Sequence, residues 1–484
     1  MASNNHHRDD QGDSDGPDSV DRDDQTSQTR TDGGGVGAGV RTIQPEQQSQ
    51  PEGTLPETAT VCIVGLGYVG LPLAVAFDEA GQRVVGIDVD EGKVDALADG
   101  DDPTGEVGDA ALADSSAHFT TDAARIERAD FVIVTVPTPV DDLGNPDLTF
   151  IEAAGETIGD HVSPGTTVIL ESTVFPGATE TVLVPAIEDA SGFTAGEEFA
   201  VGYSPERASP GREGRGLSDV VKIVGANSEE VRDRLAALYE SVVDAGVYRA
   251  PDIETAETAK VIENVQRDIN IALVNELAVA CDYMDLSTTE VLEAAGTKWN
   301  FHDEYEPGLV GGHCIPVDPH YLAHRSEREG FSPKLVLQAR EINEYVPVHV
   351  AEMTVKAINE ADNVLRDSDV LVLGLSYKSD VGDIRTSEVD AVISELSEYG
   401  VESTGFDPHV DPERAREVFD VDLQASFDPT GFDGIVLATG HEEFRSLDLD
   451  GVADAMSDDP ILMDVPGALD EAAATEAGFA YHRL

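Results

Sequence analysis

Basic residues are scarce in this chain of 484 residues, which has 30 Lys plus Arg against 96 Asp plus Glu. The formal net charge is −66 at pH 7, and the acidic residues are spread along the whole sequence. Such a field repels nucleic acid and anionic membranes, so we expect neither as a partner. Because this charge exceeds what solubility requires, we interpret it as halophilic adaptation to concentrated salt, which screens self-repulsion; an ordinary acidic protein is the alternative.

Cysteine and long apolar runs are also rare. Three cysteines, an odd number, argue against a disulfide framework and indicate a reducing compartment. No stretch approaches the roughly 18 apolar residues of a membrane span. The N-terminal sequence MASNNHHRDDQGDSDGPDS lacks the apolar segment of a secretory signal. We therefore expect a cytoplasmic location.

The texture of the sequence changes several times, and the length predicts roughly three domains. Residues 1–56 have almost no large apolar side chains and are predicted to form a disordered acidic tail. Residues 57–250 and 363–484 alternate short β-rich runs with helical segments, as in parallel βαβ units. Residues 251–362 are helical, and 253–284 contain no Gly or Pro, which indicates one long buried helix. The predicted fold class is α/β, with two Rossmann-like doubly wound domains joined by a long central helix and a helical middle domain.

A glycine-rich turn follows the first apolar strand. Gly65, Gly67 and Gly70 open a helix after residues 61–64, and Asp88 ends the next strand. The first glycine allows a tight turn, the second lets the backbone approach a pyrophosphate, and the third lets the helix pack on the strand. An acidic residue after the second strand accepts ribose hydroxyls and repels a 2′-phosphate. The pattern predicts NAD as cofactor, although a structural glycine turn is the alternative.

The second α/β domain begins with a similar run, VLVLGLSYKSDVGDIRTS at residues 370–387, but lacks the second and third glycines. We expect Lys378 and Arg385 to hold a different nucleotide there. A surface loop with two solvated bases is the alternative.

The three cysteines lie in different surroundings. Cys62 falls in an apolar strand and Cys281 in an apolar helix face, so both are interpreted as packing residues. Cys314 lies in GLVGGHCIPVDP at 308–319, a turn bounded by Gly and Pro, in which a thiol can face a cavity. The turn predicts a reactive thiolate, with a structural cysteine as the alternative.

Polar residues around the predicted sheet and helix suggest further site groups. Lys260 and Asn264 are spaced i and i+4 on the long helix and share a face, so they are candidates to hold a water or an oxyanion; a solvated stripe is equally consistent. Glu171, Thr173 and Glu206 lie near predicted strand ends, where open α/β sheets bind ligands.

A metal site is the rival interpretation of the cysteine loop. The possible zinc ligands there are His313, Cys314, Asp318, His320 and His324. Their spacing matches no standard zinc pattern, so we predict no bound metal.

Taken together, the motifs resemble the UDP-glucose/GDP-mannose dehydrogenase family from about Thr60 to Leu484. The matching segments are GLGYVG (65–70), VPTPVD (136–141), ESTVFPG (171–177), SPER (204–207), AKVIENVQRDINIALVNE (259–276), GLVGGHCIPVDPHYL (308–322) and GLSYKSDVGDIRTS (374–387).

The resemblance implies roles for individual residues. Catalytic roles fall to Cys314 as nucleophile, Lys260 and Asn264 as oxyanion stabilisers, Asp318 as the group assisting the water step, and Glu206 and Thr173 as residues positioning water. NAD contacts are expected from Gly65, Gly67, Tyr68, Val69, Gly70, Asp88, Thr138 and Thr173. Contacts to a UDP-sugar are expected from Glu206, Arg207, Lys260, Asn264, Gly311, Lys378 and Arg385. The family also implies a homodimer formed through the long helix.

Two departures bear on the substrate. Family members acting on UDP-glucose usually have lysine at the position of Val317 and a second acid at that of Pro210. With TKWNF at 297–301, the cysteine loop looks like the branch that oxidises UDP-N-acetylhexosamines such as UDP-N-acetylmannosamine or UDP-N-acetylglucosamine. We therefore expect four-electron oxidation of C6 to the uronic acid through a cysteine thiohemiacetal and thioester. UDP-glucose is the alternative substrate; a non-catalytic NAD-binding protein and a single-step hydroxyacid dehydrogenase are further alternatives.

Overall fold

The computed structural model describes residues 58–141, 144–208 and 214–484. The predicted tail, 1–56, and Pro210 lie outside these ranges. No helix within the described ranges is long and apolar enough to cross a membrane.

The first sheet, as far as the structure describes it, has eight strands in the order β3-β2-β1-β4-β5-β6-β7-β8. Neighbouring strands are parallel except β6 and β7. The strands are β1 (Thr60–Val64), β2 (Arg83–Ile87), β3 (His118–Thr120), β4 (Phe131–Val134), β5 (Thr167–Leu170), β6 (Ala200–Tyr203), β7 (Lys222–Ala226) and β8 (Val247–Arg249). Because the chain leaves β1 toward β2 and later returns to β4 on the other side of β1, the switch point lies between β1 and β4, where such sheets bind ligands.

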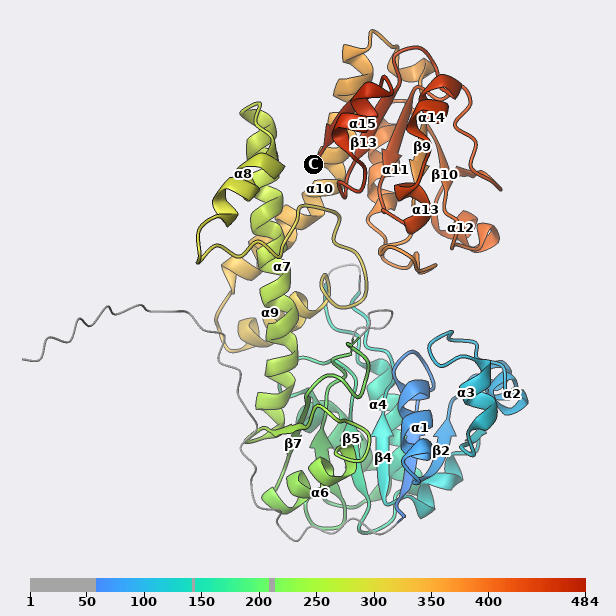
Figure 1. Ribbon diagram of the computed structural model, residues 1–484. Coiled ribbons are helices and arrows are strands. Elements are labelled where there is room, and N and C mark those ends of the chain that lie inside the picture. Colours follow the sequence, from blue (N-terminus) through green and yellow to red (C-terminus); the bar gives the residue numbers. More distant parts are fainter. Residues whose placement is uncertain (1–57, 142–143, 209–213) are drawn as a thin grey trace, which may run out of the picture. The chain divides into compact units, whose positions relative to one another are not determined.

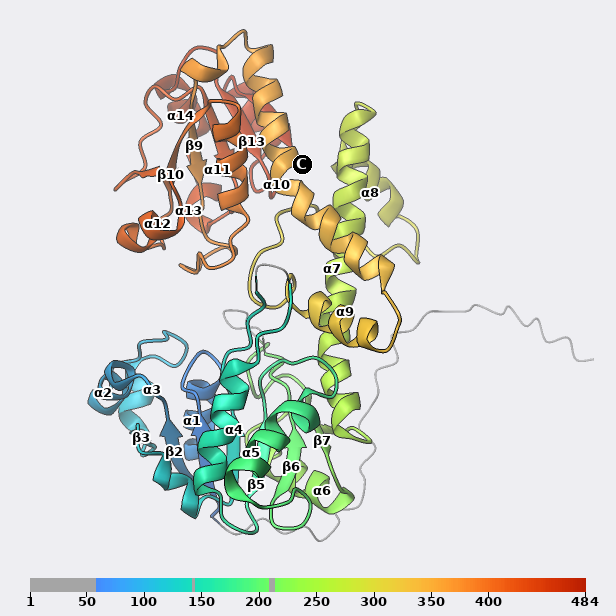
Figure 2. The ribbon, with the colours of Figure 1, turned by 180° about the vertical axis from the view of Figure 1, so that it is seen from behind.

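Helices cover both faces of this sheet, as Figures 1 and 2 show from opposite sides. They are α1 (Gly70–Glu79), α2 (Glu91–Asp99), α3 (Asp109–Asp114), α4 (Thr149–His161), α5 (Val184–Ser191) and α6 (Glu229–Tyr239), with helical turns η1 (Ala123–Arg128) and η2 (Thr179–Leu183). Side chains alternate between the faces: Cys62 and Val64 of β1 belong to one buried cluster, whereas Val61 and Ile63 belong to another. A strand buried on both faces is typical of a doubly wound sheet.

The middle of the chain is helical. Its elements are α7 (Ile253–Tyr283), α8 (Thr288–Gly296), α9 (Asp318–Arg328) and α10 (Lys334–Glu360). Asp252 caps α7 by accepting a hydrogen bond from the Thr255 N–H, and the helix runs unbroken for 31 residues (Figure 1). The sequence prediction of one long helix over 253–284 is confirmed to within one residue.

A buried polar network joins α7, α10 and the start of the cysteine loop. Arg340 Nη1 donates to Asp268 Oδ1 at 2.7 Å, and Asn343 Nδ2 donates to the same oxygen at 2.8 Å. Asn275 Nδ2 donates to Asn343 Oδ1 at 2.8 Å. The Asn275 amide also brackets Gly308: its Oδ1 accepts from the Gly308 N–H at 2.8 Å, and its Nδ2 donates to the Gly308 carbonyl at 3.1 Å. The first residue of the cysteine loop is therefore fixed to α7.

A second parallel sheet lies within residues 363–484 and has six strands in the order β11-β10-β9-β12-β13-β14. Its strands are β9 (Asp369–Leu373), β10 (Glu402–Phe406), β11 (Asp422–Leu423), β12 (Gly434–Leu437), β13 (Ile461–Asp464) and β14 (Ala480–Arg483). The helices are α11 (Val389–Glu398), α12 (Pro412–Val418), α13 (Glu442–Arg445), α14 (Leu449–Ala455) and α15 (Glu471–Glu476), with the turn η3 (Leu365–Asp367). Along β9, Val370 and Val372 face one buried cluster and Leu371 and Leu373 the other. The predicted fold class is confirmed.

Candidate active site

The glycine turn after β1 has the shape that a dinucleotide requires. A Cβ on Gly70 would lie 1.9 Å from the Gly65 carbonyl oxygen, so only glycine fits where α1 approaches the turn. A Cβ on Gly67 would meet nothing within 4 Å, and Gly65 has a φ of +99°. Val69, at the N-cap of α1, makes no side-chain capping bond. The turn is therefore open at Gly67, beside the N-terminus of α1, where a pyrophosphate can approach the backbone.

Asp88 lies at the carboxyl end of β2, where the adenosine ribose of a dinucleotide is expected. Its Oδ2 accepts from the Leu66 N–H at 2.8 Å and from Lys93 Nζ at 2.9 Å, and its Oδ1 accepts from the Asp90 N–H. Burial alone would raise the pKa of Asp88, but these donors outweigh it and lower the pKa. The carboxylate is charged and held against the glycine turn. The contact between Lys93 and Asp88 was not predicted from the sequence.

Two loops that follow β4 and β5 are tied together. Thr138 Oγ1 donates to the Thr173 carbonyl oxygen at 2.6 Å. The Thr138 carbonyl in turn accepts from the hydroxyl of Tyr321, a buried residue of α9. The structure thus brings these two threonines together at the carboxyl edge of the sheet and connects them to the helix that follows the cysteine loop.

The cysteine loop ends at α9 beside two residues of α7. The backbone N–H of Asp318 donates to the Cys314 carbonyl at 3.0 Å, and Asn264 Nδ2 donates to Asp318 Oδ2 at 2.6 Å. Cys314 is exposed, whereas Lys260 and Asp318 are buried. The structure therefore gathers the predicted nucleophile, the predicted amine and amide, and the predicted carboxylate.

The charges in this cluster act on each other. Burial raises the pKa of Asp318 to about 6, with Lys260 and the Asn264 hydrogen bond acting in the opposite direction. Protein atoms around the Cys314 thiol raise its pKa, while Lys260 and Arg267 favour the thiolate. A carboxyl group that titrates near neutral pH can both accept and return a proton.

Glu206 and Arg207 form a separate, fully engaged turn after β6. Glu206 Oε1 accepts from the backbone N–H of Arg207 at 2.8 Å and from that of Ala208, and its Oε2 lies 3.0 Å from Lys222 Nζ. The Arg207 guanidinium forms a fork with Glu263 of α7 at 2.6 and 3.1 Å. Sequence reasoning missed Lys222, although a lone lysine in the apolar run VVKIVG signals a buried partner.

A cavity of about 290 Å³ lies at the carboxyl ends of β9, β12 and β13. Gly311 and Lys378 both line it. A Cβ on Gly311 would lie 2.6 Å from the Thr386 carbonyl oxygen and 2.8 Å from the Tyr377 Cβ, so the cysteine loop needs glycine to approach this sheet. Since the switch point of the second sheet lies between β9 and β12, this is the expected position of its ligand.

Arg385 is not among the residues lining the cavity. Its guanidinium forms a fork with Asp383 at 2.8 and 2.9 Å and lies 4.7 Å from the centre of the Tyr68 ring. The structure therefore brings together one residue predicted for the nucleotide sugar and one predicted for NAD.

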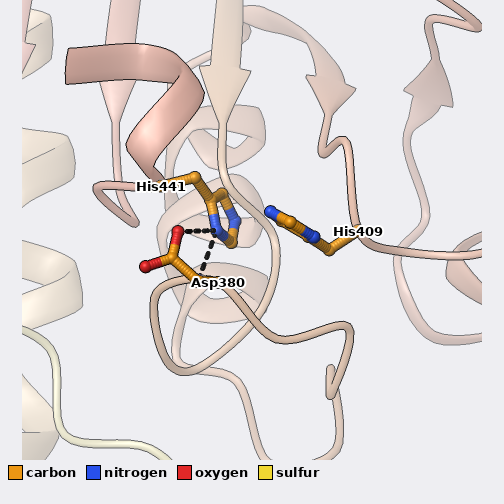
Figure 3. A group of neighbouring side chains, drawn as sticks. All are labelled: Asp380, His409 and His441. Atoms are coloured by element: carbon orange, nitrogen blue, oxygen red, sulfur yellow. Dashed lines mark hydrogen bonds and ion pairs between the residues drawn. The ribbon is translucent and has the colours of Figure 1, made fainter. Parts of the chain in front are cut away.

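The histidines near the cysteine loop have separate surroundings. His313 Nε2 lies 4.0 Å from Asp383 Oδ2, whereas the tilted rings of His324 and Phe175 have their centres 5.0 Å apart, so the two histidines face different neighbours. In the part of the chain that the structure describes, the group with ligand atoms close together is a different one, Asp380, His409 and His441, within 4.8 Å (Figure 3).

The buried His441 ring is already fully engaged. Its Nδ1 accepts from the Asp380 backbone N–H at 2.8 Å, and its Nε2 lies 3.0 Å from Asp407 Oδ2. Asp407 also accepts from the backbone N–H groups of Leu375 and Ser376. Both ring nitrogens of His441 therefore have protein partners. One of these partners is Asp380, in the turn that also contains Lys378, so His441 helps to fix that turn beside the cavity.

The sequence matches three domain profiles of one family: the UDP-glucose/GDP-mannose dehydrogenase NAD binding domain at residues 59–243, central domain at 254–345 and UDP binding domain at 371–471. Protein CapL of Staphylococcus aureus is 41% identical over 409 residues, which cover 84% of this chain and 96% of CapL. UDP-N-acetyl-D-glucosamine 6-dehydrogenase of Pseudomonas aeruginosa is 41% identical over 412 residues, 85% of this chain and 97% of that enzyme.

Among solved structures, that of the UDP-D-ManNAc dehydrogenase from Pyrococcus horikoshii has a TM-score of 0.79 at 29% identity, and the match covers 88% of this chain and 98% of the other. The family resemblance and the NAD cofactor expected from the sequence are both confirmed. The chain therefore belongs to the UDP-glucose/GDP-mannose dehydrogenase family and is an NAD-dependent nucleotide-sugar dehydrogenase.

Proposed function

We propose that the protein oxidises the C6 hydroxymethyl group of a UDP-N-acetylhexosamine to a carboxylate, with two NAD molecules reduced per sugar. The observation that carries this proposal is the cluster of Cys314, Lys260, Asn264 and Asp318 around one loop. The names of relatives that cover most of the chain support an N-acetylated sugar. Val317, in place of the lysine usual in UDP-glucose enzymes, supports the same substrate class.

The chemistry proceeds in two oxidations. NAD, when bound, would supply the hydride acceptor for each oxidation of C6, and the proton of the C6 hydroxyl is released to solvent in the first. After the first, the Cys314 thiolate adds to the aldehyde carbon and forms a thiohemiacetal, in which Lys260 and Asn264 stabilise the oxygen anion. Loss of the second hydride leaves a thioester on Cys314. Asp318 then takes a proton from the attacking water, the C–S bond breaks, and the carboxylate leaves.

The remaining predicted residues are assigned around this centre. We propose that Gly65, Gly67 and Asp88 hold NAD, together with Tyr68, Val69, Gly70, Thr138 and Thr173. For the nucleotide sugar we propose Lys378, Gly311 and Arg385, with Arg207 and Glu206 bordering the site. The corresponding division is an NAD-binding region at 57–250, a dimerisation region at 251–362 and a UDP-sugar-binding region at 363–484.

Replacement of Cys314 tests the covalent mechanism. Cys314→Ala is expected to abolish acid formation while NAD binding survives, because the glycine turn belongs to another segment. The wild type is expected to release two NADH per sugar, and rapid quenching should show a nucleotide-sugar adduct on the peptide containing Cys314. If Cys314→Ala releases two NADH per sugar at the wild-type rate, the thioester mechanism is wrong and the second oxidation proceeds through an aldehyde hydrate.

A panel of UDP-sugars tests the substrate. We expect kcat/KM for UDP-N-acetylglucosamine or UDP-N-acetylmannosamine to exceed that for UDP-glucose in side-by-side assays. A preference for UDP-glucose would leave the mechanism in place and refute the N-acetylhexosamine assignment.

We also propose a homodimer, supported by exposed apolar side chains at the end of α7 and on α8, among them Leu273, Leu277, Tyr283, Met284 and Val291. Light scattering at several protein concentrations tests it, and a monomer throughout would refute it. The free cysteines support a reducing, cytoplasmic location, which cell fractionation tests.

A further inference from the structure

Four polar side chains meet inside the first domain at the carboxyl edge of its sheet. Glu171 follows β5 and Glu206 lies three residues beyond β6. Because β7 is antiparallel to β6, its first residue, Lys222, starts at the edge where β5 and β6 end. Tyr239, the last residue of α6, completes the group. The reversed strand β7 thus brings the Lys222 ammonium to the edge of the sheet where Glu171 and Glu206 follow the parallel strands β5 and β6.

The contacts in this group are close, and Lys222, Glu171 and Tyr239 are buried. Lys222 Nζ bonds to Glu171 Oε1 and lies 3.0 Å from Glu206 Oε2. Tyr239 donates its hydroxyl to Glu171 Oε2 at 2.5 Å, and its ring centre lies 5.2 Å from Lys222 Nζ. The side chains of Lys222 and Glu171 are 2% and 0% exposed. A lysine buried this deeply requires charged partners, because desolvation alone strongly disfavours the ammonium.

The two carboxylates respond differently to the shared lysine. Burial raises the pKa of Glu171 despite Lys222. Burial would raise the pKa of Glu206 too, but Lys222 and the N–H groups of Arg207 and Ala208 outweigh it and lower the pKa. Glu206 is therefore the firmly ionised partner, and its lone pairs point to groups that hold it in place. Such a carboxylate is suited to fixing geometry, whereas Asp318 remains the carboxylate suited to proton transfer.

The turn that Glu206 organises borders the reaction centre. Arg207, the next residue, is forked onto Glu263, which precedes Asn264 on α7. A displacement of Glu206 would therefore act on the same stretch of α7 that holds the predicted oxyanion donors.

We propose that Lys222 is a positioning residue of the dehydrogenase, which holds Glu206 and its turn against α7 rather than only neutralising Glu171. This inference rests on the proposed function insofar as Glu206 borders the site. Because the Lys222 side chain is buried and its ammonium bonds to Glu171 and Glu206, its removal is expected to lower kcat while KM for the UDP-sugar is kept.

The test uses a double variant, because Lys222→Met alone would leave two buried carboxylates without a cation and endanger folding. Glu171→Gln/Lys222→Met removes both buried charges at similar volume and leaves Glu206 without its ammonium. We expect this variant to melt cooperatively and to lose about 10²-fold in kcat, the size of effect that a misplaced site produces. Lys334→Met, at the exposed first residue of α10, is the matched control and should behave as the wild type.

Two comparisons decide the outcome. Glu171→Gln alone keeps the Lys222–Glu206 contact and is expected to lose clearly less activity than the double variant; an equal loss would assign the effect to Glu171 and overturn the proposal. A crystal structure of the double variant should show the Glu206 carboxylate turned away from the Arg207 and Ala208 N–H groups, and an unmoved carboxylate would also overturn it. The crystallographic result stands even if the wild type oxidises no UDP-N-acetylhexosamine, which would refute the proposed function alone.

Discussion

Asp318→Asn should gain stability relative to the wild type as pH rises. The same substitution should impair the reaction. Asp318 is buried, and its pKa rises from an ordinary 3.8 to about 6 in the folded protein. Ionising it in the folded state therefore costs about 3 kcal/mol, since one pKa unit is worth about 1.4 kcal/mol. The contribution of Asp318 to the free energy of unfolding is therefore fully present below the unfolded pKa, where the buried group is protonated, and is lost as pH rises through the folded pKa. Asparagine cannot ionise, so the variant shows no such loss.

The assay is urea unfolding of wild type and Asp318→Asn in molar KCl, from about pH 4 to about pH 7. The wild-type free energy of unfolding should fall by about 2 kcal/mol relative to the variant across this window, since a small part of the total of about 3 kcal/mol is already lost at about pH 4, whatever constant offset the new amide adds. In single-turnover experiments the variant should hydrolyse the thioester about 10²–10⁴-fold more slowly and accumulate it on Cys314. A difference in stability that stays constant with pH would refute the reasoning, because it would mean that burial does not perturb this carboxyl group.

Three other outcomes are expected. Gly70→Ala should lower Tm and weaken NAD binding, because its Cβ would meet the Gly65 carbonyl at 1.9 Å, whereas Gly67→Ala, with nothing within 4 Å, should keep Tm and weaken NAD binding only. Equal Tm losses in calorimetry would contradict this. Tm should rise from about 0.1 M to about 1 M KCl as the Debye length falls from about 10 to about 3 Å; a flat profile would separate the −66 charge from salt adaptation. Chelators should leave activity intact, since both ring nitrogens of His441 have protein partners, and recovery by added zinc after a loss would contradict this.

The sequence predicted the elements whose signals are local. Alternating β and α texture, the uninterrupted 253–284 segment and the Gly65 turn needed only periodicity and glycine spacing, and the fold class followed from them. The i and i+4 spacing of Lys260 and Asn264 placed both on one face of α7, but it did not show that the Asn264 amide would bond to Asp318, 54 residues further along the chain.

Contacts that depend on strand direction escaped prediction. Nothing local to Lys222 shows that β7 runs antiparallel to β6, and that reversal alone brings the lysine to Glu171 and Glu206. The engagement of Arg207 with Glu263 and of Arg385 with Asp383 was likewise hidden, since a motif shows which residue types are present and not which neighbours compete for them. The roles of the individual site residues stay predictions.

The Asn275 amide has a consequence for motion in the cysteine loop. It pairs with both the N–H and the carbonyl of Gly308, much as a neighbouring β-strand would, although Gly308 lies in no strand. The Asn275 side chain is itself buried and bonded to Asn343 of α10. The Gly308 amide can therefore exchange with solvent deuterium only after its bond to Asn275 opens. We expect this amide to exchange more slowly than those of the exposed loop residues that precede it, because its acceptor is held in place by α10.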